Sequence, residues 1–153
     1  MNRRIASRMT TISPSLTLAI TAKSKAMKAA GEPVVSFGAG EPDFNTPQHI
    51  IDAAKRALDA GYTKYTPSSG LLSLRKAVAE KFRRDNGLDY EPSQIIVSNG
   101  AKHSIFNACY ALLEEGDEVI IPAPYWLTYP EVVKVCGGVP LYIEGKKEDK
   151  FKI

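Results

Sequence analysis

In the first half of the chain, hydrophobic residues recur at the spacing of helices in three segments. The second of these predicted helices has Thr46 as a candidate N-cap and Pro47 as its first helical residue. Gly31, Gly61 and Gly87 are the expected C-terminal stops. The apolar positions are Leu16, Ile20 and Met27 in the first helix, Ile51, Ala54 and Leu58 in the second, and Leu71, Leu74, Val78 and Phe82 in the third.

In the second half, short apolar runs alternate with helical patterns. The runs predict strands at 95–98, 118–121 and 139–143, and helices lie between them at 101–114 and 128–135. A further short strand is predicted at 34–37. Short connections of this kind imply right-handed crossovers and a largely parallel sheet covered by helices, so the predicted fold class is α/β. Because three strands leave a sheet edge uncovered, the chain is expected to be the first part of a longer protein.

Composition narrows the classes of function. The chain has 153 residues, 44% of them hydrophobic, and a net charge of +3 from 20 basic and 17 acidic residues. This small basic excess, without interleaved aromatic residues, argues against a nucleic-acid partner. Cys109 and Cys136 lie in apolar stretches and are expected to be reduced thiols. With two histidines and no ligand-like spacing, no metal site is expected.

The N-terminal segment is basic. Residues 1–31 contain no Asp or Glu but include Arg3, Arg4 and Arg8. This composition resembles an organelle transit peptide, and equally a basic arm followed by an ordinary helix. The longest apolar piece is too short for a membrane span or a signal sequence, so a cytoplasmic protein with a basic N-terminal arm and no membrane partner is expected.

The glycine-rich loop at 38–43, GAGEPD, begins like a dinucleotide fingerprint. Asp43 occupies the third glycine position, and Pro42 prevents a continuous turn into a helix. No phosphate-binding P-loop motif is present either. The loop is therefore interpreted as a tight turn, or as a backbone that approaches a ligand closely because its glycines permit it.

A second corner, at 98–104, carries more chemistry. A predicted strand runs into Ser98, Asn99 and Gly100, and a helix begins with Lys102 in its first turn, where the helix dipole disfavours a cation. Free amides at such a helix start can bind an anion, with Ser98 and Ser104 as additional donors. Alternatively, Asn99 simply caps the helix. A bound anion would offset the unfavourable position of the lysine.

Aromatic residues flank these loops. Trp126, the only tryptophan, follows the strand at 118–121 and could face the same pocket as the 98–104 corner, where an indole can stack on an aromatic ligand. Tyr62 and Tyr65 are either turn-packing residues or phenol donors to a phosphate. A tryptophan that only packs in the core is the simpler alternative for Trp126.

Four motifs in order along the chain, GAGEPDFNTP (38–47), TKYTPSSG (63–70), SNGAKHS (98–104) and PAPYWLTYPE (122–131), together resemble the N-terminal part of a class I, fold-type I pyridoxal-phosphate aminotransferase. The similarity is greatest to the bacterial aspartate aminotransferase subgroup. It implies an N-terminal arm and small-domain segment over residues 1–45. Residues 46–153 would begin the large domain that binds pyridoxal 5′-phosphate, and the protein would be a homodimer with shared active sites.

The resemblance also implies roles for individual residues. Gly100, Ala101 and Lys102 would open the helix that holds the cofactor phosphate, and Trp126 would stack on the pyridine ring. Tyr65 would reach the phosphate of the neighbouring subunit. The backbone of Gly40 would lie beside the substrate α-carboxylate. The side-chain carboxylate of an acidic substrate would be recognised by Ser15, Thr17 and Lys102, since a flexible point charge suits a carboxylate.

Two features depart from the family pattern. The Schiff-base lysine, the acid that pairs with the pyridine nitrogen and the arginine for the α-carboxylate lie later in the family's sequences. No catalytic residue is therefore assigned within 1–153, and the chain alone is expected to be inactive. Prephenate-using relatives often have a basic residue where this chain has Ile12, so aspartate with 2-oxoglutarate is the preferred pair of amino acid and 2-oxo acid.

Two other interpretations remain open. The first is an aminotransferase for aromatic or neutral amino acids, from which Lys102, Ser15 and Thr17 would distinguish an aspartate enzyme, or for prephenate, with which Thr17 and Lys102 are compatible. The second belongs to another class, a short non-catalytic binding or dimerisation module that has kept the phosphate corner.

Overall fold

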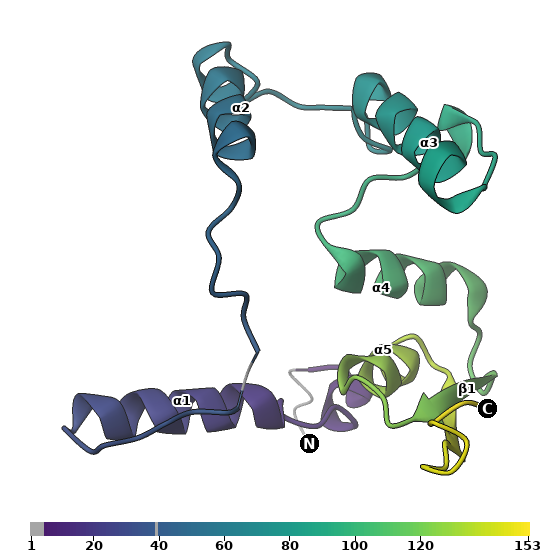
Figure 1. Ribbon diagram of the computed structural model, residues 1–153. Helices are drawn as coiled ribbons and strands as arrows, with labels where there is room; N and C mark the ends of the chain where they lie inside the picture. Colours follow the sequence, from purple (N-terminus) through teal and green to yellow (C-terminus); the bar gives the residue numbers. More distant parts are fainter. Residues whose placement is uncertain (1–4, 39) are drawn as a thin grey trace. The chain divides into compact units, whose positions relative to one another are not determined.

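The computed structural model describes residues 5–38 and 40–153 of the chain (Figure 1). Arg3 and Arg4 of the predicted basic arm, and Ala39 of the glycine-rich loop, lie outside the described residues. The elements in chain order are η1 (Ser7–Thr10), α1 (Leu16–Ala29), α2 (Gln48–Asp59), α3 (Leu72–Asn86), η2 (Pro92–Gln94), α4 (Ala101–Leu112), β1 (Glu118–Ala123), α5 (Thr128–Val135) and β2 (Val139–Glu144).

The chain forms two compact units. The first combines the described residues up to Gly38 with Asn99–Ile153, and the second is formed by the described residues between them, up to Ser98. The predicted domain boundary near residue 45 follows from resemblance rather than from contacts within this chain, and it stays a prediction.

A parallel β–α–β arrangement forms the centre of the first unit. β1 pairs with β2 in parallel, from Glu118 opposite Val139 to Ala123 opposite Glu144, and α5 is the crossover helix between them. Ile121 of β1 and Val133 of α5 are buried. Since an apolar strand face must be covered, the packing of α5 against both strands stabilises the unit. The predicted α/β class and parallel pairing are confirmed.

Polar contacts attach the N-terminal segment to the same helix. The Ser13 backbone N–H donates to Glu131 Oε2 at 3.0 Å, and Lys134 Nζ donates to Glu131 Oε1 at 3.1 Å. Both side chains of the ion pair are less than one-third exposed. Glu131 therefore joins two parts of the first unit that are more than one hundred residues apart in sequence.

The second unit contains α2, α3 and η2. Ala79 of α3 and Ile95, just after η2, are its buried apolar residues, and Phe82 meets Tyr90 edge to face with ring centroids 6.2 Å apart. α3 ends at Gly87, whose φ of 65° is the left-handed conformation expected of a helix stop. The apolar face predicted for α2 is largely exposed, with Leu58 among its exposed residues.

Two predicted strands are wrong. Residues 34–37 and 95–98 are not in strands, and the sheet within the described residues has two strands instead of three. Ile95 is nevertheless extended, and burial alternates from this residue onward, since Ile95 is buried, Ile96 exposed and Val97 half-buried. Alternating burial is typical of a β-strand, but a strand also requires a hydrogen-bonded neighbouring strand. These two segments have no such partner in the described part of the chain.

Helix boundaries also differ from the prediction. α2 begins at Gln48, with Pro47 as the N-cap residue, so Thr46 is not the cap. α4 ends at Leu112 rather than residue 114, because Leu113 adopts an extended conformation. The Glu114 N–H then donates to Asp117 Oδ2 at 2.8 Å, so that turn, rather than a further helical residue, satisfies the amide.

Candidate functional site

The start of α4 is an open corner formed by Gly100. This residue is the N-cap, with φ 85° and ψ 165°, a conformation that is strained for any residue with a side chain. Its carbonyl accepts from the N–H groups of His103 at 3.1 Å and Ser104 at 3.3 Å. No atom lies within 4 Å of the position that a Cβ would occupy. The backbone is therefore accessible to a ligand at this point.

The alternative in which Asn99 caps this helix is wrong. The cap is Gly100, which has no side chain to accept a hydrogen bond. Instead, the backbone N–H of Asn99 donates to Nδ1 of His103 at 3.1 Å. This bond resembles a capping box shifted by one residue, with Nδ1 of the imidazole as the acceptor.

Three consecutive amides remain available at the corner. The N–H groups of Gly100, Ala101 and Lys102 donate to no acceptor among the residues that the structure describes. The first turn of α4 contains no acidic residue. Unpaired amides together with the positive end of the helix dipole suit an anionic group such as a phosphate.

The side chains of Lys102 and Trp126 lie close together, and the pocket that the sequence analysis expects them to share stays a prediction. Lys102 Nζ lies 5.5 Å from the centroid of the Trp126 ring, which is within cation–π range. The tryptophan is 48% exposed, so its indole is accessible to a ligand. The cation that the helix dipole disfavours therefore gains a contact with the aromatic ring.

The segment that carries Trp126 is held by its neighbours. Tyr125 stacks on Tyr142 of β2 with ring centroids 5.0 Å apart. Loss of hydration, and then the hydroxyl of Tyr142, raise the pKa of the Tyr125 phenol. The Trp126 carbonyl accepts from the Tyr129 N–H at 3.0 Å, at the start of α5. In the sequence, Trp126 therefore lies between Tyr125, which stacks on Tyr142, and the start of α5.

Ser15 and Thr17 have local structural roles in this conformation. Ser15 is the N-cap of α1, and its hydroxyl accepts from the Leu18 N–H at 3.3 Å. The Thr17 carbonyl accepts from the hydroxyl of Thr21 at 2.8 Å. No hydrogen bond in the described part of the chain joins either residue to Lys102, so their role in binding a substrate stays a prediction.

Gly40 and Tyr65 belong to the second unit. No atom lies within 4 Å of a Cβ built on Gly40, and the Tyr65 side chain is fully exposed. An exposed tyrosine in a loop is compatible with a contact to another molecule. Their placement at a common site with Gly100 also stays a prediction.

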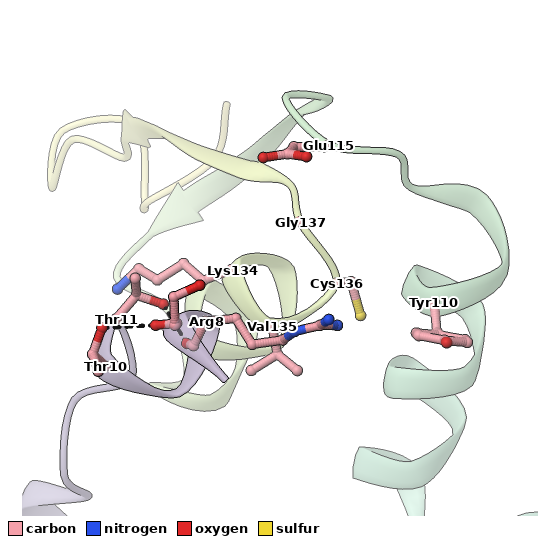
Figure 2. A pocket seen from close by; sticks show the side chains of 10 residues that line it. Arg8, Thr10, Thr11, Tyr110, Glu115, Lys134, Val135, Cys136 and Gly137 are labelled. Atoms are coloured by element: carbon pink, nitrogen blue, oxygen red, sulfur yellow. Dashed lines mark hydrogen bonds between the residues drawn. The ribbon is translucent and has the colours of Figure 1, made fainter. Parts of the chain in front are cut away.

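A separate cavity of about 630 Å³ lies between η1, α4 and α5 (Figure 2). None of the predicted site residues lines it; Arg8, Tyr110, Glu115 and Cys136 do. Burial, and then the nearby Cys109 thiol, raise the pKa of Cys136, and both thiols are free.

Among the described residues, no group of three or more His, Cys, Asp or Glu could hold a metal ion. No described helix has the length and apolar content needed to cross a bilayer.

Sequence reasoning missed two residues with structural roles, one in each unit. One is His103, whose Nδ1 orders Asn99; the other is Arg75, which donates to two backbone carbonyls in the second unit. An N3 residue with an acceptor side chain, as in a capping box, is the signal that could have indicated His103. Arg75 had no such local signal, because its two acceptors lie in different segments.

A family model described as "Aminotransferase class I and II" matches residues 32–153, and the chain belongs to this family. The aspartate aminotransferase of Bacillus subtilis (strain 168) is 59% identical over 150 residues, which cover 98% of this chain and 38% of that protein. The aspartate/prephenate aminotransferase of Nitrosomonas europaea is 49% identical over 150 residues, with the same two coverages.

Solved structures agree with the sequence relatives. The aspartate aminotransferase from Thermus thermophilus with maleate superposes with a TM-score of 0.95 at 46% identity, covering 99% of this chain and 40% of that one. The enzyme from Rhizobium meliloti gives a TM-score of 0.92 at 48% identity, with coverages of 98% and 38%. The resemblance to the N-terminal portion of such enzymes is confirmed, and the chain spans about two-fifths of the relatives it matches.

Membership of the family implies pyridoxal phosphate as a cofactor. The residues at the start of α4 fit its phosphate group, because three adjacent amides are unpaired in the described structure and no acidic residue opposes them. The exposed indole of Trp126, in contact with the same helix through Lys102, fits an aromatic ring.

Proposed function

We propose that the chain supplies the N-terminal part of a pyridoxal-phosphate-dependent aspartate aminotransferase. The complete protein, meaning this chain with the remainder that its relatives have, would move an amino group between aspartate and 2-oxoglutarate in two half-reactions of a ping-pong mechanism. The observation that carries the proposal is the contact between Lys102, in the first turn of α4, and Trp126 beside three unpaired amides.

The start of α4 would hold the cofactor. The amides of Gly100, Ala101 and Lys102 would donate to the phosphate, and Trp126 would cover one face of the pyridine ring. Pyridoxal phosphate, when bound, supplies the carbonyl group and electron sink that amino-group transfer requires. Tyr65, on an exposed loop, would donate its hydroxyl to the phosphate of the partner subunit in a homodimer.

Other residues of the chain would bind the substrate. Lys102 would leave the Trp126 face to meet the distal carboxylate of an acidic substrate, with Ser15 and Thr17 as additional hydroxyl groups. The backbone at Gly40 would lie beside the α-carboxylate, which the open space at this glycine permits. No residue of this chain is assigned a proton transfer, and we propose that the chain alone is inactive.

The names of the relatives support an acidic substrate. Proteins 59% and 58% identical to this chain are named aspartate aminotransferases, and one solved relative contains maleate, a four-carbon dicarboxylate. Dicarboxylate recognition is also what a flexible lysine at position 102 would provide.

Prephenate is the second candidate substrate. Two relatives, 51% and 49% identical, are named for aspartate and prephenate together, the first as probable. Lys102 and Thr17 are compatible with a dicarboxylate of that kind, whereas Ile12 offers no charge where prephenate-using enzymes often have a basic residue. We therefore rank aspartate first, and we place transfer from aromatic or neutral amino acids below both.

We further propose a cytoplasmic homodimer in which residues 1–45 form the arm and small-domain segment and residues 46–153 begin the large domain. Amino acids and 2-oxo acids would be its small-molecule partners. These assignments rest on similarity to the family over nearly the whole chain.

The test is steady-state kinetics of the complete protein. The amino donors are aspartate, alanine and an aromatic amino acid, and the acceptors are 2-oxoglutarate and prephenate. We expect the largest kcat/KM for aspartate with 2-oxoglutarate. A larger value for prephenate as acceptor would reverse the ranking, and no transfer from any amino acid would favour the non-catalytic module. The 153-residue chain, assayed in parallel, should show no transfer.

A further inference from the structure

Arg75 connects two separate segments of the second unit through their backbone. Its Nε donates to the Gly70 carbonyl at 3.2 Å, and one terminal guanidinium nitrogen donates to the Pro92 carbonyl at 2.9 Å. The side chain is half-buried on α3. A guanidinium can make both bonds at once because its donors form a rigid planar fork, which an ammonium does not have.

The carbonyl that Arg75 holds belongs to a closely packed glycine. A Cβ built on Gly70 would lie 2.7 Å from Cγ2 and 2.8 Å from Cβ of Val97, and φ at Gly70 is 95°. On the other side of this contact, the Val97 N–H donates to the Ser69 carbonyl at 3.0 Å. The two segments thus approach each other as closely as only a glycine permits.

The contact joins two stretches that lead into the proposed phosphate site. Gly70 ends the loop that carries Tyr65, and a turn is closed there by the Gly70 N–H, which donates to the Pro67 carbonyl at 2.8 Å. Val97 precedes Ser98, Asn99 and the Gly100 corner by one to three residues. Pro92, whose carbonyl is the second acceptor, begins η2, and η2 ends directly before the buried Ile95.

We propose that Arg75 is a positioning residue for phosphate binding. By fixing the carbonyls of Gly70 and Pro92, it holds Ser69 and Gly70 against Val97, and so orders both the base of the Tyr65 loop and the segment that enters the Gly100 corner. Arg75 itself touches neither cofactor nor substrate. The inference rests on the proposed function, because that function makes both stretches phosphate ligands.

The experiment compares Arg75→Met, Arg75→Lys and the control Lys76→Met in the complete protein. Met keeps the aliphatic length without a donor, and Lys76 is the adjacent, exposed cation on the same helix. Dissociation constants are measured for pyridoxal phosphate and for pyridoxal, which lacks the phosphate, at a temperature where circular dichroism shows every variant folded. Hydrogen exchange of the Val97 amide is measured on the same samples.

For Arg75→Met we expect the dissociation constant of pyridoxal phosphate to rise about tenfold, the loss expected when charge-assisted hydrogen bonds no longer order a site. That of pyridoxal should rise less than about twofold. The Val97 amide should exchange faster in Arg75→Met. Arg75→Lys should recover part of both effects, and Lys76→Met should resemble the wild type.

Equal weakening of both ligands would overturn the proposal, because it would reveal a general structural role without a specific effect on the phosphate. Unchanged Val97 exchange would overturn it as well. If the wild-type protein binds pyridoxal phosphate no better than pyridoxal, the proposed function fails, and the positioning role fails with it. Val97 exchange then still decides whether Arg75 holds the two segments together.

Discussion

Gly70 and Gly100 both have a positive φ, in very different surroundings. Their φ values are 95° and 85°, both in the region that disfavours a side chain. At Gly70 a Cβ would meet Val97 at 2.7 Å, whereas at Gly100 nothing lies within 4 Å. The first glycine is held among backbone carbonyls and an arginine, and the second opens onto unpaired amides.

The two glycines therefore have different explanations. At Gly70 both backbone conformation and packing require the absence of a side chain, which makes this position a structural contact. At Gly100 only the backbone conformation requires it, and the space beside the residue is left for the ligand. A turn glycine with open space around unpaired amides is a better indicator of a binding site than a glycine that packs tightly.

The largest effect is expected for Gly70→Ala. Strain at positive φ together with the clash against Val97 should lower the free energy of unfolding by about 3 kcal/mol. Urea unfolding of the complete protein measures this loss. Gly116→Ala is the matched control, because Gly116 has φ 91° and nothing within 4 Å of a Cβ. Equal losses for the two variants would mean that the Val97 contact does not matter.

Gly100→Ala should have a smaller effect on stability and a larger one on binding. Without a clash, the cost is the backbone strain of about 1–2 kcal/mol, similar to that of Gly116→Ala. A change in the corner backbone would misdirect the amides, so the affinity for pyridoxal phosphate should fall about tenfold or more. Equilibrium dialysis measures this affinity. An affinity unchanged from that of Gly116→Ala would remove Gly100 from the phosphate site.

Lys102→Met should change substrate preference. Loss of a charge-assisted hydrogen bond to the distal carboxylate should lower kcat/KM for aspartate by about 10- to 100-fold. Alanine has no such carboxylate and should be affected less than about threefold. Lys55→Met, an exposed lysine on α2, is the control. Equal losses for aspartate and alanine would refute the role assigned to Lys102.

The smallest effect is expected for His103→Ala. It removes the acceptor of the Asn99 amide, and because the site is exposed, the stability should fall by only about 0.5–1 kcal/mol. The Asn99 amide should exchange faster with solvent. His103→Gln, which retains an acceptor at N3, should restore its protection. If Gln and Ala behave alike, the hydrogen bond does not order the corner.

Much of the local structure could be predicted from sequence. Helical periodicity located the five α-helices of the described residues, and Gly87 ends α3 in the conformation that a helix stop requires. The strands at 118–123 and 139–144 and their parallel pairing also agree with the prediction. These features depend on residues close together in the chain, which is why spacing and turn residues suffice to indicate them.

Local sequence patterns indicated the candidate site, and the roles of its residues stay predictions. The Gly100 corner was recognisable because a strand-like run, a glycine and a helical pattern are contiguous, and Trp126 was expected near it from the topology of parallel strands. The hydrogen bond from the Asn99 amide to His103 was missed because Asn is a common N-cap, whose own side chain would be the acceptor. In the structure the acceptor is instead the side chain of His103. The residue roles that depend on the cofactor or a second subunit stay predictions.

The amino-acid sequence by itself determined the order of the elements, the breaks at glycines and the four motifs that indicate the family, because each is encoded within a short stretch. Only the tertiary structure decided that residues 95–98 form no strand within the described part of the chain, that Arg75 joins Gly70 to Pro92, and that Lys102 lies over Trp126. Those features depend on pairs of residues distant in sequence, whose approach is set by packing and hydrogen-bond geometry rather than by local preference.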